Sequence, residues 1–208
     1  MSNKLYLKEE MFNNLQVEIY RRTILKFTCS RYNRLLSIDA SSKVCGFAVY
    51  ENGSIQDFGR IYFPVEYLQL KPYAKDRIGE ITDALIYLIE KYNPGTVVVE
   101  NPYMPRKNTK NKCDINTYNA IAPIRDNLWY YCRNNCLDYH VMTSKRWQSF
   151  ITEIKVPRER DDIKAWSIEC IEIIFGINLD IHLHDISDAI LLGLAYRRQR
   201  ERNSSEKW

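Results

Sequence analysis

Four carboxylates are placed where a folded chain could bring them to one site. Each lies at the end of an apolar run or at the start of an apolar segment; they are Asp39, Glu100, Asp185 and Asp188. Acids grouped in apolar surroundings are unstable without cations, because burial and mutual repulsion both disfavour their charged form. Two divalent metal ions about 3.5–4 Å apart are the usual machinery for cutting phosphodiesters. The four positions therefore predict a two-metal site.

Two of these acids lie at the ends of expected strands. Asp39 belongs to the apolar run 35–40, and Glu100 directly follows the β-branched run 96–99. A carboxylate in such a run is costly to bury unless a cation meets it, and a bound metal ion is one such partner. Asp39 also fits the start of an ordinary turn, because two serines follow it closely.

The other two acids open the last apolar segment. Asp185 and Asp188 are three residues apart at a helix start, so they share a face in the turn where the helix dipole favours negative charge. The pair also fits a helix cap that resembles a capping box. His184, next to Asp185, fits either a cap or surface residue or a group that contacts a metal.

The hydrophobic pattern predicts the strands and helices that would position these acids. The runs 35–40, 44–50 and 55–63 are expected to form an antiparallel meander, with Asn52-Gly53 as a hairpin turn. A helix within 72–92 would then cross to a strand at 96–99 that is covered on both faces. Further segments complete the pattern: helices at 114–136, 163–175 and 185–200, and a strand at 139–142 followed by a brief helix.

Length and composition favour one main domain. The chain has 208 residues, of which 45% are hydrophobic, enough to bury one substantial core. Residues 1–33 have an imperfect apolar period and are interpreted as an N-terminal extension that is partly helical. The main domain is expected to span residues 34–200, and residues 201–208 form a polar tail.

Charge and cysteine usage set further bounds. The net charge is only +4, but basic residues cluster at 106–112 and 197–200, a pattern that fits either a positive rim around an acidic pocket or solvated faces. The six cysteines contain no C-x-x-C pair, so neither a zinc site nor a disulfide framework is indicated. Neither a signal peptide nor an apolar run of membrane-spanning length is present, so we expect a cytoplasmic location and no membrane partner.

The order of these motifs resembles the RuvC-type Holliday junction resolvases of the ribonuclease H-like superfamily. The matching residues run from about 35 to 196: Ile38-Asp39 with Gly46-Phe47-Ala48-Val49, then Val98-Val99-Glu100, then Asp185-Ile186-Ser187-Asp188-Ala189. The resemblance implies an α/β fold, a ribonuclease H-like mixed five-stranded sheet flanked by helices, whose first three strands form the antiparallel meander.

The resemblance also implies roles for other residues. Tyr103 lies where family members carry an aromatic that stacks on bases at the junction, although an ordinary loop tyrosine fits as well. Lys145 and Lys164 match basic positions near the scissile phosphate, where a lysine stabilises developing charge, and each also fits a surface lysine. The remaining expected DNA contacts come from the basic loop: Arg106, Lys107, Lys110 and Lys112.

The implied reaction is Mg²⁺-dependent hydrolysis of DNA strands at a four-way junction. Asp39 would bridge two Mg²⁺ ions, for which Mn²⁺ could substitute, and the other three acids would complete the metal shells. The products would carry a 5′-phosphate and a 3′-hydroxyl. Paired symmetric nicks require a two-fold homodimer, for which the apolar helix 114–136 is a candidate face, although core packing explains its stripe equally well.

The sequence departs from the family pattern at two places, and two other functions fit the same residues. The glycine often found soon after the first aspartate is absent from Ala40-Ser41-Ser42-Lys43, and residues 1–33 are added; both favour a divergent, phage-type member acting in a host cytoplasm. A ribonuclease H-like nuclease of another kind, acting on RNA/DNA hybrids or branched replication DNA, would need the same acids. A non-catalytic junction-binding protein would not need all four.

Overall fold

A seven-stranded mixed sheet forms the centre of the structure, a computed structural model that describes residues 6–21, 31–101 and 115–205. The strands lie in the order β1-β2-β5-β4-β3-β6-β7. Their bounds are Tyr6–Phe12 (β1), Leu15–Arg21 (β2), Arg34–Asp39 (β3), Val44–Glu51 (β4), Ser54–Tyr62 (β5), Thr96–Asn101 (β6) and Asp138–Thr143 (β7). The pairs β1–β2, β2–β5, β5–β4 and β4–β3 are antiparallel. The pairs β3–β6 and β6–β7 are parallel.

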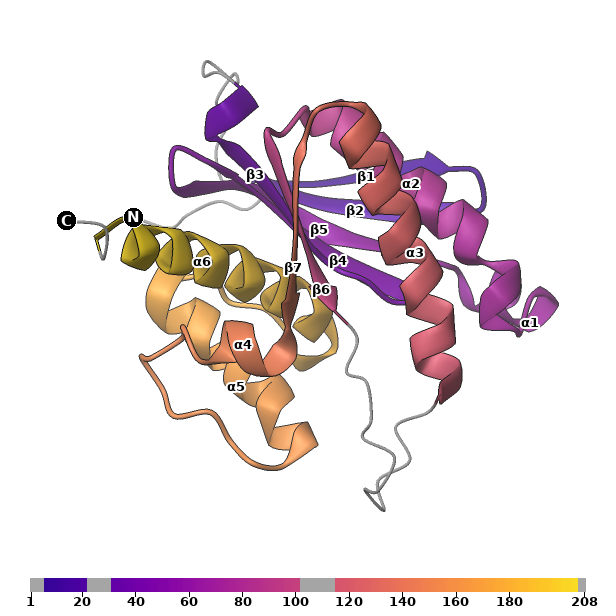
Figure 1. Cartoon of the computed structure of the whole chain (residues 1–208). Coiled ribbons are helices and arrows are strands. Elements are labelled where there is room, and N and C mark those ends of the chain that lie inside the picture. The colour runs from indigo at the N-terminus through magenta and orange to yellow at the C-terminus, as the bar shows by residue number, and fades with distance from the viewer. Residues whose placement is uncertain (1–5, 22–30, 102–114, 206–208) are drawn as a thin grey trace.

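Helices cover both faces of the sheet (Figure 1). Helices α2 and α3 pack on one face, and α4, α5 and α6 on the other. The α-helices are Val65–Leu70 (α1), Ile78–Tyr92 (α2), Ile115–Asn134 (α3), Ser144–Gln148 (α4), Arg160–Phe175 (α5) and His184–Ser205 (α6), and short 3₁₀ helices lie at Arg31–Asn33, Ala74–Asp76 and Ile181–Leu183. Within the described ranges, no helix combines the length and apolar character needed to cross a membrane.

Alternation along the strands divides their side chains between two cores. In β3, Leu36 and Ile38 join the core beneath α2 and α3, while Leu35 joins the core beneath α6. In β6, Val97 and Val99 join the first core and Val98 the second. Side chains alternate between the two faces along a strand, so the last residue of a strand faces the same core as the residue two positions before it.

The predicted α/β class, the antiparallel meander and the crossover to a buried parallel strand are confirmed. The sheet has seven strands instead of the expected five. Helix α1 was not predicted, and α6 continues to Ser205, past the expected end near residue 200.

Within residues 1–33, the described residues 6–21 form the hairpin of β1 and β2 where a helix was expected, and residues 31–33 form a short 3₁₀ helix. Leu15, Val17 and Ile19 are buried at a spacing of two, which is the period of a strand. Asn13 has φ 51° and lies in the two-residue turn between the strands, a backbone conformation that asparagine tolerates. Strand β2 pairs with β5, so the hairpin extends the central sheet.

Helix α6 packs against β3 and β4 at unusually close range. The Ser37 hydroxyl on β3 donates to the Ala189 carbonyl at 2.7 Å, and the Tyr50 hydroxyl on β4 donates to the Ile190 carbonyl. A Cβ atom at Gly193 would lie 2.4 Å from Cε2 of Tyr50 and 2.7 Å from Oγ of Ser37. The helix can therefore reach this depth only because residue 193 lacks a side chain.

We expect Gly193→Ala to destabilise the fold by about 2 kcal/mol, because the new methyl group would enter a fully packed layer. This loss corresponds to a fall of roughly 5 °C in Tm, measurable by thermal unfolding. Gly79→Ala is the matched control, since nothing lies within 4 Å of the Cβ position at Gly79 on α2. That variant should be as stable as the unmodified chain or slightly more stable; equal losses in both would contradict the packing argument.

Candidate active site

The ends of two parallel strands bring Asp39 and Glu100 to the same place. Strands β3 and β6 are neighbours in register, with Ile38 opposite Val99, so the next residues along are Asp39 and Glu100. Each lies two residues beyond a side chain that faces α6, Ser37 in β3 and Val98 in β6. Alternation therefore places both carboxylates on the α6 face, at the carboxyl end of the parallel strands.

The start of α6 adds the other two acids. Asp39 is paired with Gly46 across β3 and β4, and a Cβ atom at Gly46 would lie 1.9 Å from the carbonyl oxygen of Asp185. The bare backbone of β4 thus lets the first turn of α6 lie directly beside Asp39. Asp188 follows one turn later. All four acidic side chains are half-buried, so protein surrounds them while part of each stays open to solvent.

The four acids perturb one another electrostatically. Burial raises the pKa of Asp39, and the charges of Glu100, Asp188 and Asp185 raise it further. Burial, Glu100 and Asp185 raise the pKa of Asp188 to about 8. Residues separated by up to 149 positions in the chain therefore share one anionic site.

Two side chains of α4 hold Glu100. The Ser144 hydroxyl donates to one Glu100 oxygen, and Nε1 of Trp147 donates to the other at 2.8 Å. Burial raises the pKa of Glu100, and these two hydrogen bonds oppose that effect. Neither Ser144 nor Trp147 was among the predicted site residues. The one available signal, the brief helix directly after strand 139–142, does not reveal that β7 pairs with β6.

Basic groups border the acids. Burial raises the pKa of Asp185, and the charges of His184, Lys164 and Arg60 oppose this rise. Lys164 on α5 also opposes the raised pKa of Asp188, so the predicted basic position lies beside the predicted acids. Nε2 of His184 is 3.6 Å from Oδ1 of Asp185, and its Nδ1 is 3.2 Å from the Ile181 carbonyl oxygen. Arg60 was not among the predicted site residues.

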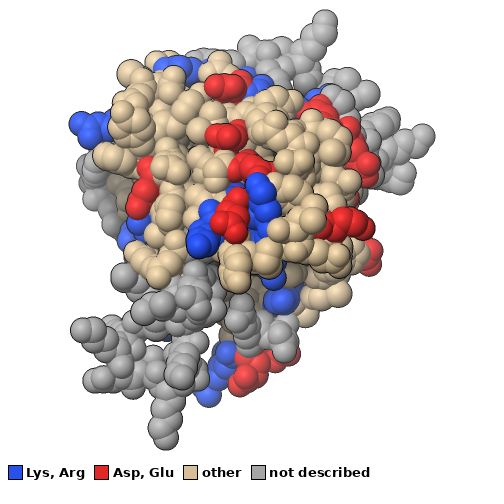
Figure 2. Space-filling model, turned by 90° about the vertical axis from the view of Figure 1, so that its right-hand side faces the viewer, with Lys and Arg blue, Asp and Glu red and all other residues tan. Residues whose placement is uncertain are grey.

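Most of the expected DNA contacts lie outside the described residues. These are Tyr103, Arg106, Lys107, Lys110 and Lys112. Lys145 is exposed on α4, next to the serine that holds Glu100. In the basic cluster at 197–200, Arg197 donates to the Gly53 carbonyl and Arg198 pairs with Glu153. On the face shown in Figure 2, acidic and basic side chains are interspersed, without a continuous positive patch.

The donor set fits divalent cations that prefer oxygen ligands. All four groups are carboxylates, and Oδ1 of Asp188 is buried without a hydrogen-bond partner among the described residues. No three His, Cys, Asp or Glu side chains in those residues already form a metal-binding group. Repulsion between unneutralised carboxylates opposes such a group, and Glu100 is turned towards Ser144 and Trp147. Cation binding would therefore require side-chain rotation.

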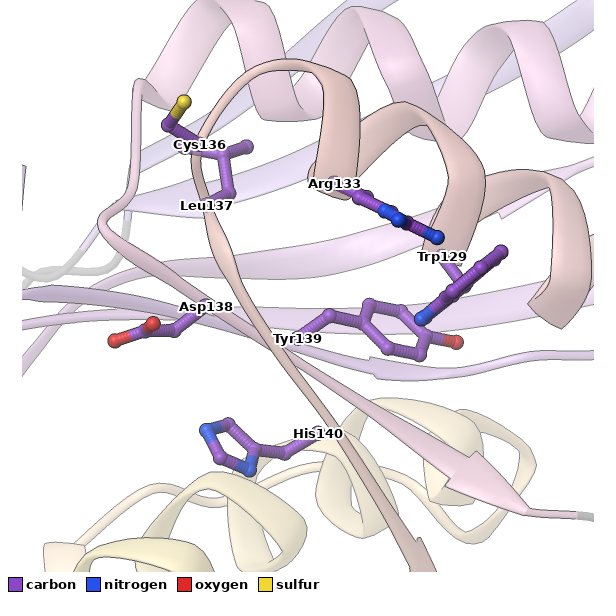
Figure 3. Close-up of a pocket in the computed structure, with 7 residues that line it drawn as sticks. All are labelled: Trp129, Arg133, Cys136, Leu137, Asp138, Tyr139 and His140. Atoms are coloured by element: carbon purple, nitrogen blue, oxygen red, sulfur yellow. The ribbon is translucent and has the colours of Figure 1, made fainter.

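A separate hollow of about 510 Å³ lies between α3 and β7 (Figure 3). Its lining residues are Trp129, Arg133, Cys136, Leu137, Asp138, Tyr139 and His140. Arg133 stacks over the Trp129 ring at 5.4 Å, and His140 contacts the ring of Tyr196. This hollow lies by the first residues of β7, whereas Glu100 is paired with Met142 near the other end of that strand. It is therefore not part of the acidic site.

Solved structures with the same arrangement of elements identify the fold. The T. thermophilus RuvC structure in complex with a Holliday junction substrate has a TM-score of 0.60 and 12% identity, covering 82% of this chain and 96% of that one. The chain has the RuvC fold. A second T. thermophilus RuvC structure has the same identity and coverage with a TM-score of 0.57. The predicted resemblance to RuvC-type resolvases is thereby confirmed in the fold.

The RuvC fold is also shared with a yeast mitochondrial Holliday junction resolvase. That structure has a TM-score of 0.52 and 14% identity, and the match covers 85% of this chain and 84% of that one. No family model matches the sequence, and no curated protein matches it either. The RuvC fold is thus shared at only 12–14% sequence identity.

The shifted pKa of Asp188 predicts how the metal-free protein responds to pH. A carboxyl whose folded pKa is about 8, above its ordinary 3.8, binds protons more tightly when folded, so its stabilising contribution is lost as the pH rises from about 4 to 8. In the presence of a chelator, Asp188→Asn should therefore raise Tm by roughly 5 °C more at pH 8 than at pH 5.

The control for this experiment is Asp83→Asn, which changes an exposed carboxylate on α2. It should shift Tm little at either pH. Thermal unfolding followed by circular dichroism gives both values. An Asp188→Asn effect that is the same at pH 5 and pH 8 would contradict the electrostatic account of the site.

Proposed function

We propose that this chain is a structure-selective endodeoxyribonuclease that resolves four-way DNA junctions by paired symmetric nicks. The observation that carries the proposal is the convergence of Asp39, Glu100, Asp185 and Asp188 on the α6 face of a RuvC fold. The similar structures support the substrate class, because one is RuvC with a Holliday junction substrate and another is a mitochondrial Holliday junction resolvase.

The four carboxylates would hold two Mg²⁺ ions, or Mn²⁺ in their place. Bound there, such ions supply Lewis-acid stabilisation of the phosphate and lower the pKa of the attacking water. Asp39 would be the central one of these ligands, because the charges of all three other acids act on it. Lys164 stabilises negative charge that builds on the phosphate oxygens. Hydrolysis in this way leaves a 5′-phosphate and a 3′-hydroxyl.

Glu100 depends on its two hydrogen-bond donors for its orientation. Ser144 and Trp147 each bind one carboxylate oxygen, so together they restrict the rotation of the Glu100 carboxylate. Trp147 is almost completely buried, which prevents its ring from following Glu100 if that side chain turns. Partners of this kind set the position and affinity of a metal-binding carboxylate.

DNA contact and pairing of two subunits complete the proposal. Lys145 would bind the phosphate backbone of the DNA beside Glu100. The junction would also be contacted by residues of the basic loop: Tyr103, Arg106, Lys107, Lys110 and Lys112. The exposed aromatic residues Trp129 and Tyr130 lie on α3 and support this helix as the face of a two-fold homodimer. A homodimer would present two acidic sites related by the same symmetry as the paired nicks.

The central test compares a labelled synthetic four-way junction with a linear duplex and an RNA/DNA hybrid, each with and without Mg²⁺. We expect symmetric nicks in the junction, in Mg²⁺ only, and a loss of roughly 100-fold or more in Asp39→Asn. Asp83→Asn, a change to an exposed acid on α2, is the matched control and should cut like the unmodified chain. Gel analysis of the products gives both the rate and the positions of the nicks.

The other outcomes of this test separate the alternatives. Equal cutting of duplex and junction would overturn the resolvase proposal, and preferential cutting of the hybrid would identify another ribonuclease H-like nuclease. Junction binding without cutting would identify a binding protein. Cutting in a chelator would overturn the metal-dependent reaction.

A second prediction concerns the orientation of Glu100. Trp147→Phe keeps a buried aromatic ring but removes the 2.8 Å hydrogen bond, so the Mg²⁺ concentration for half-maximal cleavage should rise by roughly 10–100-fold. Trp166→Phe is a control, because Trp166 is also buried but its indole donates to the Ile154 carbonyl instead. A magnesium titration in which both variants behave alike would show that Glu100 does not depend on Trp147.

A further inference from the structure

The N-terminal hairpin and the acidic site are linked by a row of residues across the sheet. Glu18 on β2 is paired with Arg60 on β5, Arg60 with Gly46 on β4, and Gly46 with Asp39 on β3. Residues directly opposite one another on neighbouring strands project from the same face. The row therefore runs on the α6 face from the hairpin to the first of the four acids.

Arg60 is held firmly at its place in this row. Its Nε donates to Oε2 of Glu18 at 2.7 Å and its Nη2 to Oε1 at 3.2 Å, and the Tyr62 hydroxyl donates to Oε1 at 3.0 Å. The guanidinium also lies 4.7 Å from the centre of the Tyr62 ring. Burial alone would raise the pKa of Glu18, but its bonds with Arg60 and Tyr62 bring the pKa below the ordinary value. The Glu18 carboxylate is thus charged and holds the guanidinium at two points along one edge.

The next position in the row brings the start of α6 close to Arg60. Gly46 has no side chain, and the space beside it is taken by the backbone of Asp185 at the start of α6. The charge of Arg60 acts on Asp185, as does that of Lys164 from the opposite helix. The Arg60 side chain keeps 20% of its surface exposed, against 10% for Glu18. A cation therefore borders the acidic site at a point that solvent and ligands can reach.

The hydrogen bonds of Arg60 leave donors for a ligand. A guanidinium has five N–H groups. Among the described residues, its side-chain donors are engaged only by Glu18, through Nε and Nη2. Three N–H groups remain, in a planar fork whose geometry matches the oxygens of a phosphate.

We propose that Arg60 is a phosphate-binding residue of the acidic site, and that Glu18 of the N-terminal hairpin positions it. This inference rests on the proposed function, because it takes the ligand of the site to be a nucleic-acid backbone. It assigns the hairpin of β1 and β2 a role in the site, through Glu18, which is not one of the four acids. Arg60 would bind a phosphate next to the one that is cut, which offsets the repulsion between DNA and four carboxylates.

The test measures binding as a function of salt, separately from cleavage. A labelled four-way junction is bound in Mg²⁺ to chains that also carry Asp39→Asn, so that no cutting intervenes. Loss of one phosphate contact makes the slope of log affinity against log salt shallower by about 1. We expect this change in Arg60→Ala, with affinity reduced by roughly tenfold. Arg60→Lys keeps the charge and should restore the slope.

Arg21→Ala is the matched control for folding. Arg21 also pairs across β2 and β5, with Asp57 at 3.3 Å, but it lies at the end of the strand pair, three residues beyond Glu18. Its loss should lower Tm without changing the salt slope. An Arg60→Ala slope equal to that of the unmodified chain would overturn the proposal, as would an equal change in Arg21→Ala.

Glu18→Gln tests the positioning role, in the chain with Asp39 intact. The guanidinium keeps its charge but loses its fixed partner, so the cleavage rate at saturating junction should fall roughly tenfold while KM and the salt slope stay unchanged. An unchanged rate would overturn the role of Glu18. If the unmodified chain binds an RNA/DNA hybrid in preference to the junction, the proposed function fails, and the same slopes measured on the hybrid still decide the role of Arg60. Absence of binding to any nucleic acid would overturn both.

Discussion

The rest of the structure depends on one constraint: four like-charged carboxylates are gathered in a single half-buried site. Each carboxylate raises the free energy of the charged form of the others, so the site persists only because packing elsewhere over-determines it. That packing is the seating of α6 on β3 and β4. Hydroxyl groups of Ser37 and Tyr50 bind backbone carbonyls of α6, and the bare backbone at Gly46 and Gly193 lets the helix approach.

The polar groups around the acids have two different roles. Ser144 and Trp147 orient Glu100 from α4, while Lys164 and Arg60 supply positive charge near Asp185. These groups come from α4, α5 and β5, so three elements in addition to those that carry the acids shape one site. Such an arrangement suits a site for a charged ligand, because attraction and orientation are provided by separate residues.

The hairpin of β1 and β2 changes how the N-terminal residues are understood. The hairpin is continuous with the sheet, because β2 pairs with β5. Glu18 on β2 and Arg60 on β5 form an ion pair with two hydrogen bonds between these strands. An asparagine in the turn and apolar residues at a spacing of two are features of a hairpin, but the segment was expected to be partly helical because many charges lie between the apolar residues. Those charges have partners on neighbouring elements, as in the pair of Glu10 with Lys91 on α2. The sequence shows the charges and does not show their partners.

By itself, the sequence determined the class of fold and the main elements from β3 to α6 apart from α1, because burial imposes a readable period on strands and helices. It also singled out the four acids, because carboxylates near apolar runs are conspicuous. The tertiary structure alone decided that β6 pairs with β7, that Trp147 meets Glu100, and that Arg60 lies beside Asp185. Periodicity reports which side of an element is buried. It carries no record of which distant element covers that side, since pairing is chosen by the packing of the whole sheet.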